Sequence, residues 1–204
     1  MKILGLTGQS GAGKTFFSTI LQEKGFPCIN ADELYHSMLI PPSPILDEIR
    51  NVFGEEFLLS DGSLNRKKLG AYVFANKERL NLLNETVLPI VTKKIQELAN
   101  EYEKAGATLL IIDAPTLFES GYNKSCDITV SIIAPSEARI ARIAERDQIS
   151  LEDATLRTKA QKDDDFYYEH SDYVVVNDED ISSLRRKCER LIFAIGICAN
   201  KAEI

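Results

Sequence analysis

One eight-residue segment near the start of the chain constrains its fold more than any other feature. Residues 8–15 read GQSGAGKT and match the phosphate-binding pattern GxxxxGK[ST] in full. With the frequencies of Gly, Lys, Ser and Thr in this chain, about 0.005 such matches are expected by chance. The pattern belongs between a strand and a helix. The apolar run over 2–7 predicts that strand, and the helical spacing of apolar residues over 16–21, ended by Gly25, predicts that helix.

The residue types in this segment indicate what it binds. Glycines let the backbone wrap closely around a phosphate so that successive N–H groups point inward, and the helix N-terminus adds positive potential. Lys14 would place a mobile charge on the β- and γ-phosphates, and the Thr15 hydroxyl would ligate Mg²⁺. A glycine-rich turn that only joined a strand to a helix would have no use for Lys followed by Thr. We therefore expect the chain to bind a nucleoside triphosphate.

Further apolar runs predict the α/β class, with a five-stranded parallel sheet in a three-layer P-loop fold. They are continuous rather than alternating, which is typical of strands covered on both faces. These predicted strands span 27–30, 108–113, 128–134 and 173–177.

The segments between the predicted strands carry helical patterns. We expect a helix from Pro44 to Gly54 opened by Ser43, one over 66–75 capped by Asn65, and a longer one over 89–105. The chain then reads as one P-loop domain made of a core, an inserted helical substrate subdomain and a helical lid. Their expected ranges are 1–35, 107–134 and 169–204 for the core, 36–106 for the subdomain and 135–168 for the lid.

The predicted lid carries a row of arginines. Ser150 followed by Asp153 is similar to a capping box and divides the lid into two helices near residue 149. Arg139, Arg142 and Arg146 are spaced by three and four residues and therefore share one helix face. Such a face is most often solvated, but beside a P-loop it is what phosphoryl transfer needs, because charge spreads over the γ-phosphate oxygens in the transition state. The acidic run 163–165 is interpreted as a solvated turn.

The amino-acid composition limits the classes of binding partner that we expect. Asp and Glu number 31 against 24 Lys and Arg, a formal charge of -7, which disfavours unaided capture of nucleic acid or an anionic membrane. No run approaches the roughly 18 apolar residues of a membrane span. Four scattered cysteines, at positions 28, 126, 188 and 198, favour reduced thiols in a cytoplasmic protein.

The class of nucleotide-binding protein can be narrowed as well. The stretch 123–126 lacks the Asp that would complete the guanine-recognition pattern Asn-Lys-x-Asp, so a GTPase is disfavoured, and a chain of 204 residues suits a small kinase. Acids at the carboxyl ends of parallel strands are then candidates for a general base or for positioning the metal. Asp32 follows the second predicted strand and is either that base or a helix N-cap. Asp113 ends the third and is either a Walker B acid that positions Mg²⁺ through water or a turn residue before Pro115.

Several other segments are together quite specific for one family. They are Gly5-Leu6-Thr7-Gly8, Ala31-Asp32 with His36, Asp61-Gly62, Leu64-Asn65-Arg66 with Leu69 and Phe74, Pro115 with Leu117-Phe118-Glu119 and Gly121, Arg142 with Arg146, Arg157 and Gln161, and Asp172 with Asn177. Over nearly its whole length the chain resembles the dephospho-CoA kinases, which phosphorylate the ribose 3'-hydroxyl of dephospho-CoA with ATP to give coenzyme A. The sequence departs from the family pattern where Asn30 replaces an Asp, Leu88 a His and Arg139 a Gln.

The resemblance implies an ATP- and Mg²⁺-dependent kinase with Asp32 as general base, assisted by Lys14 and Arg142, and with Thr15 on the metal. Implied ATP contacts come from Gly8, Ser10, Gly11, Ala12, Gly13, Lys14, Thr15, Phe16, Arg139 and Asn177. Implied contacts with dephospho-CoA come from Asp32, His36, Arg66, Asp113, Glu119, Arg146 and Gln161. Two alternatives stay open: a kinase for another small hydroxyl compound, such as a nucleoside monophosphate, and an ATP-binding regulatory protein that has lost catalysis.

Overall fold

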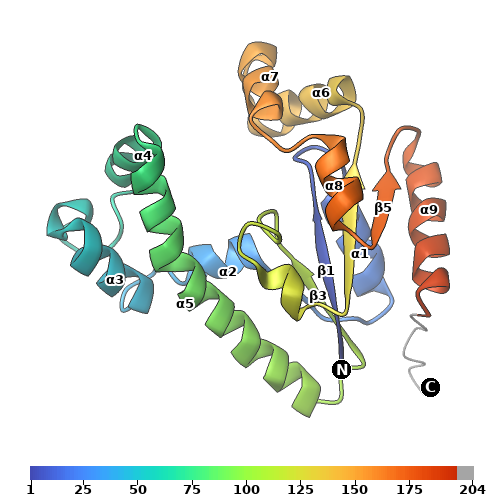
Figure 1. Ribbon diagram of the computed structural model, residues 1–204, viewed down its shortest axis with the longest axis horizontal. Coiled ribbons are helices and arrows are strands. Elements are labelled where there is room, and N and C mark those ends of the chain that lie inside the picture. The colour runs from blue at the N-terminus through green and yellow to red at the C-terminus, as the bar shows by residue number, and fades with distance from the viewer. Residues whose placement is uncertain (197–204) are drawn as a thin grey trace. The chain divides into compact units, whose positions relative to one another are not determined.

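Strand β1 (Lys2–Gly8) lies at the centre of a five-stranded sheet (Figure 1). The strand order is β2-β3-β1-β4-β5, and β1 pairs in parallel with both β3 and β4, as β4 does with β5. The other strands span Cys28–Asn30 (β2), Leu109–Asp113 (β3), Ile128–Ile133 (β4) and Tyr173–Val176 (β5). The predicted α/β class and its parallel sheet are confirmed, because continuous apolar runs are what strands buried on both faces require.

This computed structural model describes residues 1–196 and divides into two compact units. The sheet unit comprises Met1–Ile29 and the described chain from Tyr102 onward, and the helical unit comprises Asn30–Glu101. No helix within the described 1–196 combines the length and the apolar character needed to span a bilayer.

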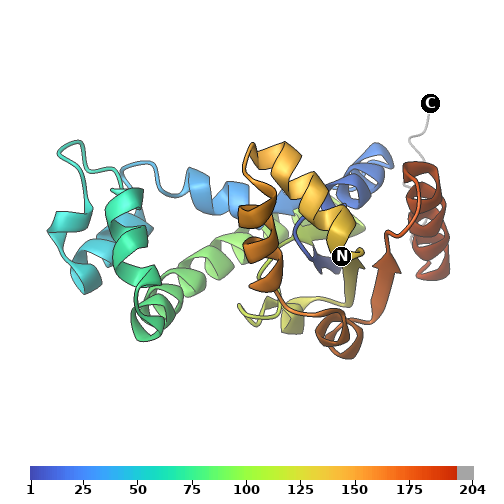
Figure 2. The ribbon, with the colours of Figure 1, turned by 90° about the horizontal axis from the view of Figure 1, so that it is seen from above.

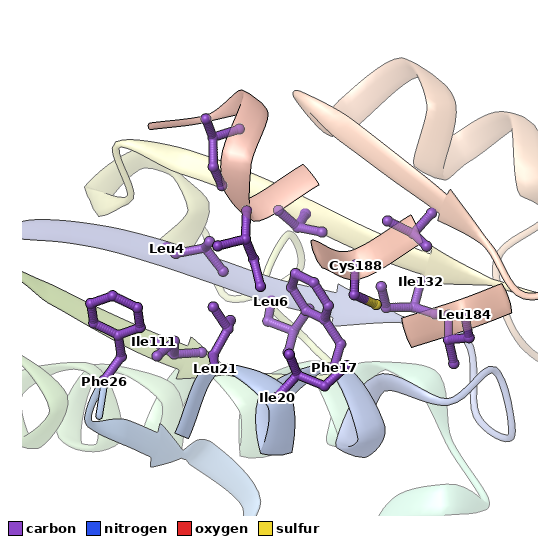
Figure 3. Close-up of a cluster of buried hydrophobic side chains, with 14 of the residues drawn as sticks. Leu4, Leu6, Phe17, Ile20, Leu21, Phe26, Ile111, Ile132, Leu184 and Cys188 are labelled. Carbon is purple, nitrogen blue, oxygen red and sulfur yellow. The ribbon is translucent and has the colours of Figure 1, made fainter. Parts of the chain in front are cut away.

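The main core lies between one face of the sheet and two helices (Figure 3). Leu4 and Leu6 of β1 are fully buried there against α1 (Lys14–Glu23) and α9 (Ile181–Ala194). Phe17 of α1 and Cys188 of α9 meet in the same cluster. Figure 2 shows α9 following β5, with α1 beside it. Burying each of the large side chains contributes roughly 1.5–3 kcal/mol, so this core anchors the turn that joins β1 to α1.

The opposite face of the sheet is covered by a turn-rich segment and by α8 (Asp164–His170). A Cβ at Gly5 would lie 2.8 Å from both Leu117 and Cys126, so glycine is needed for the segment after β3 to pack directly on β1. That segment ends in η2 (Tyr122–Ser125). The sheet unit therefore has the predicted three layers.

The region predicted to be a lid contains α6 (Ser136–Asp147) and α7 (Leu151–Lys159). The Ser150 hydroxyl accepts the Asp153 N–H at 3.0 Å, so the predicted division near residue 149 is confirmed. Residues 163–165 are exposed, as predicted, but the prediction that they form a turn is wrong. The Asp163 carboxylate accepts the Phe166 N–H at 3.0 Å and caps α8, because carboxylates in the first turn stabilise a helix N-terminus.

The helical unit contains α2 (Ala31–Ser37), α3 (Pro44–Phe53), η1 (Glu55–Phe57), α4 (Arg66–Phe74) and most of α5 (Lys77–Lys104). Ser43 and Asn65 cap α3 and α4 as predicted.

The predicted start of the long helix at Pro89 is wrong, because α5 begins at Lys77 and continues through the proline. The Asn76 side chain accepts the Arg79 N–H at 3.0 Å and so supplies an earlier N-cap. Val87, Val91, Ile95 and Ala99 form a buried stripe that runs past Pro89, and this packing offsets the one helix hydrogen bond that proline cannot make.

Candidate active site

The P-loop (residues 8–15) leaves β1 at a point where only glycine fits. Gly8 has φ +140°, and a Cβ there would lie 2.1 Å from the Ile132 carbonyl oxygen of β4. The next amide, that of Gln9, donates to the same carbonyl at 3.1 Å. The loop is thus bonded to the neighbouring strand before it turns into α1.

The backbone amides of the P-loop fall into two groups. Those of Gln9, Ser10 and Ala12 are bonded within the protein, to Ile132 O, Gln161 Oε1 and Gln9 O, each at 3.1 Å. Over the described part of the chain, no acceptor is found for the amides of Gly11, Gly13, Lys14 and Thr15. These four N–H groups (the amide nest) cluster where α1 begins. Because a helix N-terminus also carries positive potential, they form a site for an anion such as a phosphate.

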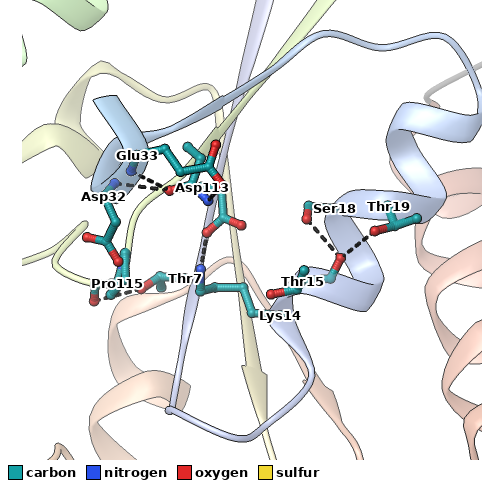
Figure 4. Close-up of polar contacts among 10 residues, drawn as sticks. Thr7, Lys14, Thr15, Ser18, Thr19, Asp32, Glu33, Asp113 and Pro115 are labelled. Atoms are coloured by element: carbon teal, nitrogen blue, oxygen red, sulfur yellow. Dashed lines mark hydrogen bonds and ion pairs between the residues drawn. The ribbon is translucent and has the colours of Figure 1, made fainter. Parts of the chain in front are cut away.

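Lys14 and Asp113 form an ion pair between the P-loop and the end of β3 (Figure 4). The Lys14 ammonium group donates to Asp113 Oδ1, and the Asp113 side chain is 4% exposed. Thr15 lies beside Lys14 in the first turn of α1 (Figure 4). The structure therefore brings together the lysine, the hydroxyl residue and the strand-end acid, as parallel strand topology predicts.

The three arginines of α6 all contact the P-loop. Arg139 Nε donates to Ser10 O at 3.2 Å, Arg142 Nη1 to Gly11 O at 3.0 Å, and Arg146 Nη2 to Ser10 Oγ at 3.4 Å. The shared helix face that their spacing predicts is therefore the face toward the loop. Arg139 is the buried member, 4% exposed, and this burial lowers the pKa of its guanidinium.

The four-residue spacing of Arg157 and Gln161 predicts one shared helix face, but Gln161 lies beyond the end of α7 and the two residues have different partners. Arg157 Nη1 pairs with Asp147 Oδ2 at 2.7 Å, and the same carboxylate accepts Arg146 Nε at 2.7 Å. Hydrogen bonds from the two arginines, that from Arg146 first, lower the pKa of Asp147. Gln161 Oε1 instead accepts both the Ser10 N–H at 3.1 Å and Arg139 Nη2 at 2.8 Å.

Three more predicted residues lie elsewhere in the sheet unit. Asn177 follows β5, is 7% exposed, and donates through Nδ2 to Ala12 O at 2.8 Å. Phe16 is half-buried on α1, with the Arg185 guanidinium 5.4 Å from its ring centre. Glu119 is exposed in the turn segment after β3. Burial, followed by the charge of Glu119, raises the pKa of Tyr167 to about 12.

Asp32, His36 and Arg66 belong to the helical unit, where all three are exposed. Asn30, not Asp32, caps α2: its Oδ1 accepts the N–H groups of Asp32 at 3.0 Å and Glu33 at 3.2 Å. The alternative reading of Asp32 as the cap is therefore wrong. The Asp32 carboxylate therefore does not cap the helix. His36 lies one turn later on α2, with its ring 5.6 Å from that of Tyr35.

Sequence reasoning missed Gln9, the most deeply buried polar side chain of the P-loop. Gln9 is 2% exposed, donates through Nε2 to Asp164 Oδ1 at 2.7 Å, and accepts the Ala134 N–H at 3.3 Å. A long polar side chain at a variable P-loop position indicated a hydrogen bond to another part of the protein. The sequence did not indicate its partner, Asp164, because that residue lies far along the chain. The predicted thiols are free at Cys126 and Cys188, where burial raises the pKa to about 12, and Cys198 lies outside the described residues.

Comparison with known proteins gives this geometry a family. The model of the dephospho-CoA kinase family matches residues 2–183. The chain belongs to the dephospho-CoA kinase family. It is 34% identical over 186 residues to the dephospho-CoA kinase of Listeria monocytogenes, covering 91% of this chain and 93% of that one.

Solved structures agree with this family assignment. The dephospho-CoA kinase of Campylobacter jejuni superposes with a TM-score of 0.70 and 30% identity, covering 96% of this chain and 98% of that one. A shikimate kinase of Acinetobacter baumannii, at 18% identity and a TM-score of 0.54 over 97% and 96% of the two chains, shows that the fold extends to other kinases. The departures of this dephospho-CoA kinase family member, at Asn30, Leu88 and Arg139, thus occur within a preserved fold.

Proposed function

We propose that this protein transfers the γ-phosphoryl group of ATP to the ribose 3'-hydroxyl of dephospho-CoA, producing coenzyme A and ADP. The family match over residues 2–183 carries the proposal. The amide nest at the start of α1, with the Lys14–Asp113 pair beside it, supports it independently because it provides a phosphate site of the kind a kinase needs.

The sheet unit holds the nucleotide in this proposal. The amides of Gly11, Gly13, Lys14 and Thr15 bind phosphate oxygens, and the Lys14 ammonium moves from Asp113 to the β- and γ-phosphates. Arg142, which donates to Gly11 O, neutralises charge on the transferring group. Arg146 and Gln161, which both bond to Ser10, contact dephospho-CoA in this proposal.

The donors present fit Mg²⁺. The described residues hold no cluster of three His, Cys, Asp or Glu side chains that would form an all-protein metal cage. Mg²⁺ is commonly held by one or two protein oxygens together with water and substrate phosphates. The Thr15 hydroxyl and the Asp113 carboxylate supply such oxygens, and bound Mg²⁺ would neutralise charge on the phosphates.

The helical unit supplies the acceptor side in this proposal. Asp32 takes the proton of the ribose 3'-hydroxyl, a role open to it because Asn30 performs the capping of α2. His36 and Arg66 of the helical unit contact dephospho-CoA, as do Asp113 and Glu119 of the sheet unit. Residues 36–106 form the substrate subdomain and 135–168 the lid.

A coupled assay of ADP release tests the proposal. Wild-type protein with ATP and Mg²⁺ is supplied in turn with dephospho-CoA, with nucleoside monophosphates and with no acceptor, and Lys14→Met serves as the low-activity control. We expect ADP release that depends on dephospho-CoA, with a 3'-phosphorylated product identified by mass spectrometry. Preference for a nucleoside monophosphate would indicate the alternative kinase, and ATP binding without phosphorylation of any acceptor would indicate the lapsed regulator.

A further inference from the structure

Three consecutive carbonyl groups of the P-loop each accept a hydrogen bond from a side chain outside it. Ser10 O accepts Arg139 Nε, Gly11 O accepts Arg142 Nη1, and Ala12 O accepts Asn177 Nδ2, at 3.2, 3.0 and 2.8 Å. The donors come from α6 and from the residue after β5. The loop backbone is therefore held from outside along three successive peptide units.

The geometry of the peptide bond links these contacts to the direction in which the nest amides point. In a planar trans peptide, the carbonyl of one residue and the N–H of the next point in opposite directions. Because the Ser10 carbonyl points toward Arg139, the Gly11 N–H points away from Arg139. In the same way, because the Ala12 carbonyl points toward Asn177, the Gly13 N–H points away from Asn177. These are two of the four nest amides. The peptide between them is different, because the Ala12 N–H is bonded to Gln9 O.

Arg139 and Asn177, the first and third of these donors, are too deeply buried to contact a ligand in this arrangement. Arg139 is 4% exposed and Asn177 is 7% exposed. Arg139 is further fixed by Gln161 Oε1 at 2.8 Å. The α6 backbone lies directly against the loop, since a Cβ at Gly11 would be 2.9 Å from Arg139 O.

We propose that Arg139 and Asn177 are positioning residues, which turn the Gly11 and Gly13 amides toward the phosphates and do not touch the nucleotide. The proposal rests on nucleotide binding by the P-loop as set out above. It revises the direct ATP contacts that the family resemblance implies for these two residues. It also gives Arg139, a departure from the family's Gln, a specific task.

Nucleotide binding by calorimetry separates this role from direct contact with the γ-phosphate. Arg139→Gln and Asn177→Ala are compared with wild type and with two exposed controls, Arg186→Gln and Asn51→Ala. The nest binds phosphates that ADP and ATP share, so each test variant should weaken both nucleotides by the same factor, about tenfold. A side chain that touched the γ-phosphate would weaken ATP alone, and that result would overturn the proposal.

Amide signals in ¹H–¹⁵N NMR spectra provide a second readout. On addition of ADP, the Gly11 amide should shift less in the Arg139 variant while Gly13 shifts as in wild type, and the Asn177 variant should show the reverse. Equal responses of both amides in both variants would contradict the inference. If Arg139→Gln fails to fold, Arg139→Lys tests the same bond, because one ammonium cannot reproduce the forked contact with Ser10 O and Gln161. Wild-type protein that bound no ADP would refute the proposed function itself.

Discussion

The Lys14 ammonium group donates to the Asp113 carboxylate and so joins the P-loop to the carboxyl end of β3. Each side chain satisfies the charge of the other in a largely buried place, with exposures of 16% and 4%. A phosphate that enters the amide nest must compete with this pair for the lysine. Two opposite effects of substitution follow.

Lys14→Met should lower turnover by about 10²–10³-fold, the cost of losing one preorganised charged donor. Asp113→Asn should instead strengthen ATP binding measured without Mg²⁺, because the lysine no longer leaves a carboxylate, while turnover with Mg²⁺ falls. Calorimetry and steady-state kinetics check both. Lys2→Met, an exposed substitution at the far end of β1, is the matched control. Unchanged Mg²⁺-free ATP affinity in Asp113→Asn would show that the ion pair does not compete with the nucleotide.

Asp32→Asn tests the general base. The variant should keep its unfolding midpoint and its ATP affinity, because Asn30 caps α2 and the Asp32 side chain is exposed. Its turnover with dephospho-CoA should fall by about 10²–10⁴-fold, the usual contribution of a positioned base. Glu33→Gln, the neighbouring acid on the same helix, should retain activity. Near-normal turnover in Asp32→Asn would remove Asp32 from this role.

Local sequence patterns predicted the elements that depend on neighbouring residues. The strands, the P-loop and the caps Ser43, Asn65 and Ser150 each follow from residue types within a few positions. The start of α5 did not, since proline is a good first residue of a helix as well as a tolerated interior one when a buried stripe supports it.

The site shows the same division between local and distant information. Spacing placed Arg139, Arg142 and Arg146 on one face, but spacing cannot reveal that their partners are P-loop carbonyl and hydroxyl groups more than a hundred residues earlier. Asn30 illustrates the converse. Replacement of the family's Asp looked like a departure in chemistry, yet Asn and Asp cap helices about equally well, and Asn30 does cap α2.

Gly11 and Gly25 form a matched pair for testing how closely α6 must approach the P-loop. Both have positive φ, +76° and +85°, so alanine should cost each about 1–2 kcal/mol of backbone strain. A Cβ at Gly25 meets nothing within 4 Å, whereas one at Gly11 lies 2.9 Å from Arg139 O. Gly25→Ala should therefore bind ADP normally, and Gly11→Ala should bind it about tenfold or more weakly. Calorimetry and urea unfolding of the two variants check this, and equal ADP affinities would show that α6 can move away from the loop without consequence.

Tyr122 predicts a change in stability at alkaline pH. Its hydroxyl is buried with no hydrogen-bond partner among the described residues, and burial, followed by the nearby Cys126, raises the pKa to about 12. The folded state thus favours the neutral phenol, and this contribution is complete below the ordinary value of about 10. As pH rises from there through about 12, the unfolded state ionises first and the contribution is lost.

Tyr122→Phe should remove that part of the alkaline loss. At pH 7 it should also stabilise the protein by about 1 kcal/mol, because an unsatisfied hydroxyl is no longer buried. Urea unfolding at pH 7, 9 and 11 measures both effects, with Tyr168→Phe as the exposed control. A less stable Tyr122→Phe at pH 7 would show that the hydroxyl is satisfied in solution.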